Sequence, residues 1–253
     1  MCYLLSDGGW RCEDYERLRG ENAAFFAPQP VPDVPDVVWI KDDMNKLWNN
    51  ETFSKSSICA ALKTLSTVKG QEPAITDAAR LAARESGSEC AHLEYRVKSP
   101  SSLTRKINLE LEDSITAGSP AKAMTIAASM KDVVRYTVVH QDHEKLTETT
   151  RKVAKSLKAN GWKLTTFKQF YTDGAPYKGI HIIGETPSGT AAEVQIHSAD
   201  SLAIKNQNHL DYEVYRDPNQ APKVRRQARE ACIARSRQLR TPKDLDSLTL
   251  QDL

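Results

Sequence analysis

Apolar side chains recur every three to four positions through much of the first half of the chain, and this spacing predicts helices. Three such stretches stand out, at about residues 42–62, 76–85 and 101–111. Thr76 and Asp77 are residue types that cap helix N-termini, so the second helix is expected to begin at this pair. The first half of the chain is therefore expected to be mainly helical.

The pattern changes after Met130. Residues 133–139, VVRYTVV, are β-branched and aromatic, which is typical of a strand. Further strands are expected at residues 162–171, 179–183 and 191–197. The last two are separated by the turn-forming sequence ETPSGT, which predicts a hairpin.

Helices are expected between and after these strands. Their ranges are 145–160, about 200–216 and about 221–240. The first should end at Asn160-Gly161, a pair suited to the left-handed conformation that closes many helices. Helices that flank a few strands joined partly by hairpins predict an α+β fold, with a sheet flanked by helices, rather than a doubly wound parallel sheet.

Proline separates the N-terminal region from the rest of the chain. Residues 27–36, APQPVPDVPD, hold four prolines in ten positions, so the segment should be extended and irregular and is interpreted as a linker. The chain is accordingly divided into an N-terminal extension with this linker (1–40), a main domain (41–217) and a basic C-terminal helix with a tail (218–253). Within the extension, residues 12–18 are expected to be helical.

Composition excludes several classes of protein. The 253 residues suffice for a sizeable core, and 35 Lys+Arg against 33 Asp+Glu leave a net charge of +2, so any phosphate chemistry must come from local patches. No stretch approaches the roughly 18 apolar residues of a membrane span, and the N-terminus lacks the features of a signal peptide. Five widely separated cysteines, with no CxxC pair, indicate neither a disulfide framework nor a zinc knuckle. A soluble, cytoplasmic protein with no membrane partner is expected.

The predicted hairpin carries a group of polar residues. With its turn centred near Ser188, the alternation of side chains gathers four of them on one face: His181, Glu193, Gln195 and His197. The plain alternative is a solvated outer face of the sheet. Two imidazoles, a carboxamide and a carboxylate can, however, bind and polarise a substrate, so this face is a candidate site.

Three other segments are candidates for phosphate or nucleotide contacts. Residues 96–107, RVKSPSSLTRKI, concentrate four cations and four hydroxyls, which suits a triphosphate; the alternative is a solvated basic helix start capped by Ser101 or Ser102. Residues 177–179, YKG, end a glycine-containing loop, where an aromatic ring and an ammonium could meet a base and a phosphate. Asp132 opens the first of the predicted strands, where the alternative is a simple turn residue.

Taken in order, these segments resemble a known family. RVKSPSSLTRKI, KDVVRYTVV, YKGIH and EVQIHS occur in the order and at the approximate spacing of the RelA/SpoT-type synthetase domain, the nucleotide 3′-pyrophosphokinases that make (p)ppGpp, the alarmone of the stringent response. The resemblance covers roughly residues 45–215, and His209, sixteen residues after Glu193, is a fifth match. It implies a nucleotidyltransferase-like fold and a transfer in which an acceptor's ribose 3′-hydroxyl attacks the β-phosphorus of ATP and releases AMP.

The resemblance also implies roles for individual residues. The ATP adenine and phosphates would be held by Arg96, Lys98, Ser102 and Lys106. Asp132 and Glu193 would hold Mg²⁺, with Glu193 also able to take the hydroxyl proton, and Tyr177 would stack on the acceptor base. The remaining acceptor-side residues are Lys178, His181, Gln195, His197 and His209. Phosphoryl transfer between polyanions needs charge neutralisation and in-line positioning more than covalent chemistry, which suits this set.

Departures from the family pattern fall on the acceptor side. His197 stands where an arginine is usual, Asn208 where an acidic residue is usual, and Thr137 where an arginine is usual, with Arg135 displaced two positions earlier. Replacing arginine by histidine removes a permanently charged bidentate donor, so guanine specificity is not implied. The acceptor could be GDP or GTP, ADP or ATP, or the 3′ end of a tRNA, since some relatives in the family are toxins that modify tRNA.

The predicted C-terminal helix is strongly basic. Six cations fall on one face, with Arg235 outside it: Lys223, Arg225, Arg226, Arg229, Arg237 and Arg240. The opposite face carries Val224, Ala228, Ala231, Cys232 and Leu239 and is expected to dock on the protein. The basic face suits an RNA backbone; the alternative is a solvated helix that also mediates oligomerisation.

Several interpretations of function stay open at this point. The first is a Mg²⁺- and ATP-dependent pyrophosphokinase, either a housekeeping synthetase or a growth-inhibiting toxin neutralised by an antitoxin or immunity protein. Synthesis without hydrolysis is expected, because the residues before the synthetase region are too few for the hydrolase domain of bifunctional relatives. The second is a non-catalytic module that binds RNA or a partner protein on the same fold. A homo-oligomer is compatible with both.

Overall fold

The computed structural model describes residues 2–4 and 10–253, with side chains from Asp14 onward. The expected N-terminal extension therefore includes residues 1 and 5–9, which lie outside the described ones. The chain forms two compact units, each described here by itself. Unit 1 comprises the described residues up to Ile75 with His92–Arg135 and Thr190–Ala192; unit 2 comprises Thr76–Ala91, Tyr136–Gly189 and Glu193–Leu253. The functional division at residues 40 and 217 stays a prediction.

Unit 1 is mainly helical, as the apolar spacing predicts. A short antiparallel hairpin pairs β1 (Cys2–Leu4) with β2 (Trp10–Cys12). The helices are α1 (Glu13–Arg19), α2 (Ala23–Phe26), α3 (Asp43–Trp48), α4 (Lys55–Val68), α6 (Pro100–Thr116) and α7 (Ala123–Ser129), with 3-10 turns η1 (Val38–Ile40) and η2 (Leu93–Tyr95). Helix α1 matches the helix expected at residues 12–18 to within a residue.

The core of unit 1 lies where α4 packs against α6 and α7. On α4 the apolar side is closed, with Leu62 and Leu65 fully buried, and α6 contributes Leu103 and Ile107, also fully buried. Burying a side chain of this kind stabilises a fold by about 1.5–3 kcal/mol. The packing fixes the first turns of α6, which carry part of the cation-rich segment.

The proline-rich segment 27–36 is irregular, as predicted, but it is packed rather than loose. Val31 and the nearby Val37 are buried, and the carbonyl of Pro35 accepts a hydrogen bond from Arg96. Prolines hold such a segment extended, and apolar residues between them dock it onto the helices.

Two helix starts differ from the sequence expectation. Helix α5 (Glu72–Glu85) begins four residues before Thr76, because Pro73 is favoured in a first helical turn. Thr76 lies inside the helix, fully buried, and shares a 2.8 Å hydrogen bond with the Tyr136 hydroxyl. Helix α6 is capped by Ser99, whose side chain accepts from the backbone of Ser102, so neither Ser101 nor Ser102 is the cap.

Unit 2 is built on a mixed sheet, which confirms the α+β expectation. Among the described residues it has five strands, in the order β3 (Glu89–Ala91), β4 (Val134–His140), β7 (Ala191–Ser198), β6 (Ile180–Glu185) and β5 (Lys163–Gln169). Pairs β3–β4 and β5–β6 are antiparallel. The apolar sides of β6 and β7 are fully closed: Ile180, Ile182, Val194 and Ile196 are all 0% exposed.

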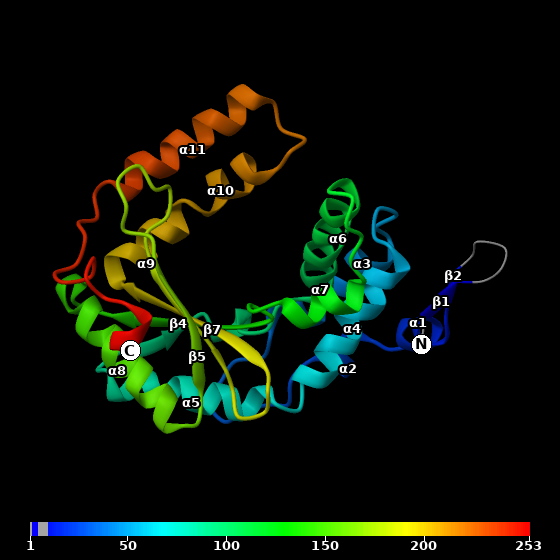
Figure 1. Ribbon diagram of the computed structural model, residues 1–253, viewed down its shortest axis with the longest axis horizontal. Coiled ribbons are helices and arrows are strands. Elements are labelled where there is room, and N and C mark those ends of the chain that lie inside the picture. Colours follow the sequence, from blue (N-terminus) through cyan, green and yellow to red (C-terminus); the bar gives the residue numbers. More distant parts are fainter. Residues whose placement is uncertain (1, 5–9) are drawn as a thin grey trace. The chain divides into compact units, whose positions relative to one another are not determined.

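The helices of unit 2 lie where the sequence predicts them, but one predicted helix is divided into two. Helix α8 (Leu146–Ala159), after the 3-10 turn η3 (His143–Lys145), ends as predicted, with Asn160 as cap and Gly161 at a φ of 79°. The expected helix at 200–216 is interrupted at Asn208, which separates α9 (Ala199–Gln207) from α10 (His209–Arg216). Helix α11 (Pro222–Ser236) ends four residues before the expected 240 and packs beside α10 (Figure 1).

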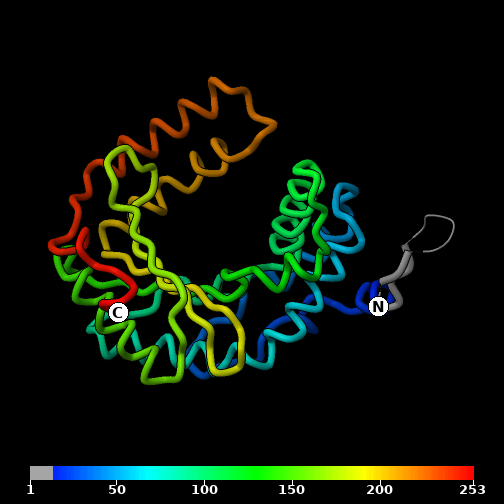
Figure 2. Tube along the Cα trace, in the orientation of Figure 1, coloured from blue at the N-terminus to red at the C-terminus, as the bar shows by residue number. Residues whose placement is uncertain are grey.

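The tail that follows α11 is anchored by leucines. Figure 2 shows the chain returning from α11 along unit 2 to its C-terminus. Leu245 is fully buried, the carbonyl of Lys243 accepts from the Thr147 hydroxyl at 2.7 Å, and the 3-10 turn η4 (Leu250–Asp252) contacts β5. In the part of the chain that the structure describes, no helix has the length and apolar character needed to cross a bilayer.

Candidate functional site

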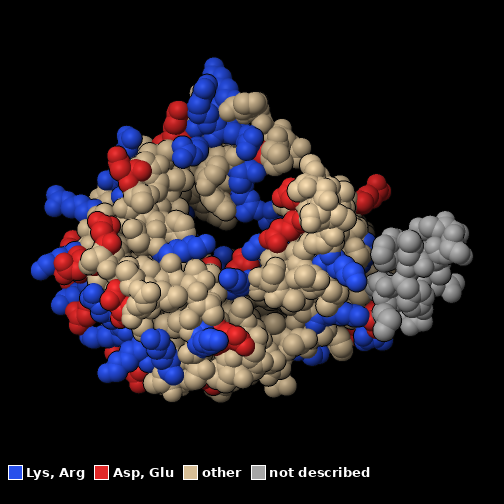
Figure 3. Space-filling model, in the orientation of Figure 1, with Lys and Arg blue, Asp and Glu red and all other residues tan. Residues whose placement is uncertain are grey.

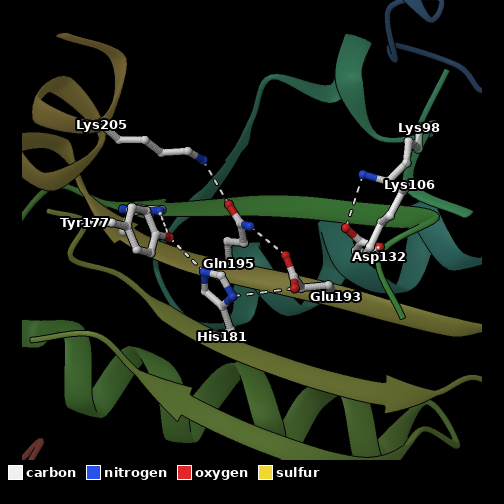
Figure 4. Close-up of polar contacts among 9 residues, drawn as sticks. Lys98, Lys106, Asp132, Tyr177, His181, Glu193, Gln195 and Lys205 are labelled. Carbon is white, nitrogen blue, oxygen red and sulfur yellow. Dashed lines mark hydrogen bonds and ion pairs between the residues drawn. The ribbon is translucent and has the colours of Figure 1, made fainter. Parts of the chain in front are cut away.

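Two lysines converge on one aspartate in unit 1. Asp132 accepts from the Lys106 ammonium at 2.8 Å through Oδ1, and its Oδ2 lies 3.1 Å from the Lys98 ammonium (Figure 4). The backbone fixes this geometry, because the Lys98 amide donates to the Val133 carbonyl, next to Asp132. Lys106 reaches the same carboxylate from the second turn of α6. We call Lys98, Lys106 and Asp132 the lysine–aspartate cluster.

Burial and charge act in opposite directions in this cluster. Burial by itself would raise the pKa of Asp132, but the charges and hydrogen bonds of Lys98 and Lys106 outweigh it and hold that pKa below its usual value. Burial lowers the pKa of Lys98, and the attraction of Asp132 offsets this only in part. The cluster is thus a partly desolvated ion triad with one positive charge in excess, an arrangement that attracts an anion.

The other cations of the segment are placed differently. Arg96 is 1% exposed, its Nε donates to Glu72 at 2.7 Å, and its Nη1 donates to the carbonyls of Pro35 and Leu93. Arg96 thus holds η2 and the proline-rich segment to α5, and its expected contact with ATP stays a prediction. Ser102 is half-buried in the first turn of α6, four residues before Lys106.

Sequence reasoning missed the residue that holds the start of α6. Asp43, only 6% exposed, accepts from the Ser101 backbone at 2.6 Å and from the Ser101 hydroxyl. A carboxylate at a helix N-terminus satisfies otherwise unpaired amides and stabilises the helix dipole. Asp43 thereby fixes the helix that presents Lys106. Asp43 precedes Ser101 by 58 positions, so no local sequence pattern connects it to α6.

The polar face of the hairpin in unit 2 is enclosed rather than solvated. Glu193 is 9% exposed and Gln195 is 6% exposed. The Gln195 amide donates to Glu193 Oε1 at 2.6 Å and its oxygen accepts from Lys205 at 2.9 Å, while Glu193 Oε2 lies 3.5 Å from His181 Nδ1 (Figure 4). Glu193, Gln195 and His181 therefore lie together, as the alternation of side chains predicts, and Lys205 joins them from α9. We call His181, Glu193, Gln195 and Lys205 the glutamate cluster.

Tyr177 lies against this cluster. Its hydroxyl is 2.8 Å from His181 Nε2 and 3.0 Å from His197 Nε2, and its ring meets that of Phe170 edge-on at 5.4 Å. Gly179 makes this possible, because a Cβ there would lie 2.3 Å from the Tyr177 hydroxyl and 2.8 Å from His197 Cε1. The loop at residues 170–179, which we call the Tyr177 loop, thus requires glycine at this position.

The departures from the family pattern are buried. His197 is 0% exposed, and burial, with the nearby charges of Lys205 and His181, holds its pKa well below the usual value, so its imidazole is neutral. Thr137 is 6% exposed within β4. A direct contact of His197 with the acceptor is not supported by this complete burial.

Asn208 is a buried connector between the Tyr177 loop and α11. Its side-chain amide donates to the carbonyl of Pro176 at 3.2 Å and reaches the Cys232 carbonyl and the Ser236 hydroxyl, and its oxygen accepts from Arg235 at 3.0 Å. An ionised acidic side chain has no donors and could not bond to the Pro176 and Cys232 carbonyls. The asparagine is therefore explained by the packing of the loop.

Lys178 and His209 are the remaining acceptor-side candidates. The Lys178 ammonium donates to the Leu239 carbonyl at 2.9 Å, above the Tyr171 ring. His209 is exposed at the start of α10. The structure therefore does not bring these two residues into the glutamate cluster.

Helix α11 presents a basic surface. The exposed cations on or just after it are Lys223, Arg226, Arg229, Arg237 and Arg240. Figure 3 shows Lys and Arg side chains gathered over this helix. Arg225 is half-buried, with its Nε donating to the Tyr215 carbonyl, and Arg235 pairs with Asp211 at 2.6 Å on the docked side, as its exclusion from the basic face predicted. Val224 was expected on the docked side, but it is 41% exposed because α11 has barely begun there.

No three His, Cys, Asp or Glu side chains group around a common point within the described residues. A metal held by this chain would therefore need oxygen atoms from another source. Mg²⁺ commonly takes one or two carboxylates together with substrate phosphates and water. Asp132 suits such a role, since its two oxygens already face two cationic ammonium groups.

Neither the scan against protein-family models nor the search of curated proteins found a match. Among solved structures, the chain is similar to a small alarmone synthetase from Bacillus subtilis bound to its product pppGpp, at 21% identity and a TM-score of 0.37, covering 56% of this chain and 71% of that one. It is also similar to the Type VI effector Tas1 in complex with its immunity protein, at 19% identity and a TM-score of 0.40, covering 72% and 95%. A GTP pyrophosphokinase family protein from Streptococcus pneumoniae aligns at 16% identity and a TM-score of 0.41, covering 66% and 85%.

Proposed function

We propose that this chain is an ATP-dependent pyrophosphokinase that transfers the β,γ-pyrophosphate of ATP to the ribose 3′-hydroxyl of a purine nucleotide. The observation that carries the proposal is the lysine–aspartate cluster. Its two ammonium groups pair with one carboxylate and can bind phosphate oxygens in its place. Four sequence segments in the order of the RelA/SpoT-type synthetase domain support it, and both clusters are built from those segments together with Lys205.

In unit 1, Lys98 and Lys106 bind the phosphates of ATP. In the absence of substrate the two ammonium groups neutralise Asp132. A triphosphate carries several negative charges and draws both lysines away from the single carboxylate, since charge-assisted contacts to phosphate are among the strongest in proteins. The exchange leaves the Asp132 oxygens available as metal ligands.

The donor chemistry of the chain fits Mg²⁺. Asp132 would be a carboxylate ligand of the ion, with the phosphates of the substrate supplying further oxygens. When bound, the ion neutralises phosphate charge and polarises the phosphorus under attack. This chain's own residues contribute by binding the phosphates through Lys98 and Lys106, which separates both lysines from Asp132.

In unit 2, Glu193 receives the proton of the acceptor hydroxyl. The 3′-oxygen forms a bond to the β-phosphorus of ATP as the bond from that phosphorus to the bridging oxygen breaks, and AMP leaves with the bridging oxygen. The proton passes to the Glu193 carboxylate, which Gln195 and His181 hold in place. The ring of Tyr177 stacks on the acceptor base, an interaction worth roughly 1–3 kcal/mol.

A transfer assay tests this function. The protein is incubated with labelled ATP, Mg²⁺ and, in turn, GDP, GTP, ADP, ATP or deacylated tRNA, and AMP and labelled product are separated. We expect AMP release with at least one purine nucleotide. The rate should fall at least about a hundredfold in Asp132→Asn and be retained in Glu110→Gln, an exposed acid on α6 that serves as the matched control. Absence of AMP release with every acceptor would refute the proposal.

A second candidate acceptor or ligand is RNA, favoured by the exposed cations of α11. Neutralisation of phosphates by such a surface makes affinity fall steeply with salt. Gel shifts with tRNA should therefore weaken with added salt and in the double variant Arg226→Ala/Arg229→Ala. Binding that persists unchanged in that variant would remove the support for this candidate.

The toxin interpretation is tested by growth. Induced expression of the chain should slow growth, and Asp132→Asn should not, if its product depletes or mimics an essential nucleotide. Rescue by a co-expressed protein would identify an immunity partner.

A further inference from the structure

A continuous line of polar groups leads from Glu193 into the interior of unit 2. Glu193 lies 3.5 Å from His181 Nδ1, and His181 Nε2 lies 2.8 Å from the Tyr177 hydroxyl. The same hydroxyl is 3.0 Å from His197 Nε2, and His197 Nδ1 is 3.0 Å from the hydroxyl of Ser201. Each imidazole thus uses both of its nitrogens, and the Tyr177 hydroxyl joins the two.

Proton counting limits how these groups can be arranged. A neutral imidazole has one N–H and one acceptor nitrogen, and a phenol has one proton to donate. If Tyr177 donates its proton to His197 or to any acceptor other than His181, then His181 must donate to Tyr177 from Nε2, and the lone pair of its Nδ1 faces the Glu193 carboxylate, which is repulsive. If Tyr177 donates to His181 instead, His181 carries its proton on Nδ1 and directs it at Glu193, which is attractive.

The interior end of the line is compatible with the second arrangement. His197 then donates from Nε2 to Tyr177 and accepts at Nδ1 from Ser201. The Ser201 hydroxyl has a competing acceptor, the Ser198 carbonyl, but at 3.3 Å that contact is longer than the one to His197. His197 has no exposed surface, so it must satisfy both nitrogens within the protein, and a neutral imidazole does so here.

From this geometry we propose that Tyr177 and His197 are positioning residues, which fix the tautomer of His181 so that its Nδ1 proton points at Glu193. The inference rests on the proposed function for the role of Glu193 and goes beyond it by giving the Tyr177 hydroxyl a task separate from that of its ring. The ring serves the acceptor base, whereas the hydroxyl and His197 orient the proton acceptor. Histidine at position 197 suits this line of hydrogen bonds, because it donates to Tyr177 with one nitrogen and accepts from Ser201 with the other. Arginine has no acceptor atom and could not accept from Ser201.

Histidine tautomers give a test that needs no substrate and no activity. Side-chain ¹H–¹⁵N spectra of the full chain at about pH 8.5, where ordinary imidazoles are neutral, distinguish Nδ1–H from Nε2–H forms. Among the signals of the six histidines, those of His181 and His197 are assigned by their loss in His181→Asn and His197→Asn. We expect His181 as Nδ1–H and His197 as Nε2–H, and a shift of His181 toward the Nε2–H form in Tyr177→Phe. The control Tyr212→Phe, at a ring 40% exposed on α10, should leave both signals unchanged.

An Nε2–H tautomer of His181 in the unaltered protein, or an unchanged tautomer in Tyr177→Phe, would overturn the positioning role and leave the proposed function standing. Kinetics supply the second readout. Tyr177→Phe keeps the stacking ring, so kcat should fall about tenfold with the acceptor KM nearly constant, whereas Tyr177→Leu should raise the acceptor KM as well. A tenfold rise in KM with unchanged kcat in Tyr177→Phe would contradict the positioning role. Absence of transfer in the unaltered protein would instead refute the proposed function and leave the tautomer result intact.

Discussion

Replacing Asp132 by asparagine separates chemistry from folding in the lysine–aspartate cluster. The amide keeps the volume of the carboxylate but removes the charge that pairs with both lysines and, in the proposed reaction, with Mg²⁺. We expect turnover to fall at least about a hundredfold, which corresponds to about 2.7 kcal/mol in the barrier.

The same change has a calculable effect on stability. The Lys98 side chain is 18% exposed and that of Lys106 is 38% exposed, so Asp132→Asn leaves one largely enclosed ammonium without its carboxylate. An unpaired charge in a fully buried site costs about 3–5 kcal/mol, but both lysines keep a path to water, so about 1 kcal/mol is expected here. For a chain of this size, that loss lowers Tm by roughly 2–4 °C.

The double variant Asp132→Asn/Lys98→Met completes the argument. Removing the enclosed ammonium as well should restore most of the lost Tm, because no unpaired charge remains, while turnover stays low. Thermal melts followed by circular dichroism give the stability, and AMP release gives the turnover. Near-normal turnover in Asp132→Asn, or turnover that recovers together with Tm in the double variant, would show that Asp132 is structural only.

Three further results are expected. Tyr177→Ala should raise the acceptor KM by about one to two decades with little change in the KM for ATP, because stacking on one base is worth roughly 1–3 kcal/mol; a selective loss of ATP binding would reverse the assignment of the two substrates. Gly179→Ala should destabilise the protein by more than about 1 kcal/mol, since the new Cβ would lie 2.3 Å from the Tyr177 hydroxyl, and a Tm equal to that of the unaltered protein would contradict this close approach. The pKa of Asp132 is depressed in the folded protein, so its contribution to stability is complete above the ordinary aspartate pKa and is lost as pH falls below about 4. The difference in unfolding free energy between the unaltered protein and Asp132→Asn should therefore shrink on acidification. A difference that stays constant with pH would contradict this expectation.

Local chemistry was enough to predict most of the elements of unit 2. β-Branched residues gave β4, and Asn160-Gly161 gave the end of α8 because a left-handed cap is a property of two neighbouring residues. Alternation along β7 also gathered Glu193 and Gln195 on one face. Each of these features depends on residues within a few positions of one another, which is the range over which sequence patterns are informative.

What the sequence could not supply were partners far along the chain. The sequence shows Arg96 as one of several cations in a segment, and only the fold shows its ion pair with Glu72, 24 positions away. The sequence leaves a solvated face of β7 as an alternative. The fold shows that His197 on this face is enclosed next to the Tyr177 loop and the start of α9. The difference between a binding residue and a structural one lies in burial, which tertiary contacts decide.

The Tyr177 loop is held by residues that come much later in the chain. Asn208 and Ser236 both donate to the Pro176 carbonyl, and the Leu239 carbonyl accepts from Lys178. A recombination breakpoint between the codons of the loop and those of α11 would join a loop from one ancestor to supports from another. Residues 170–239 are therefore expected to be inherited and exchanged as one block, because the side chains at positions 178, 208 and 236 must match the course of a backbone that lies on the other side of the breakpoint.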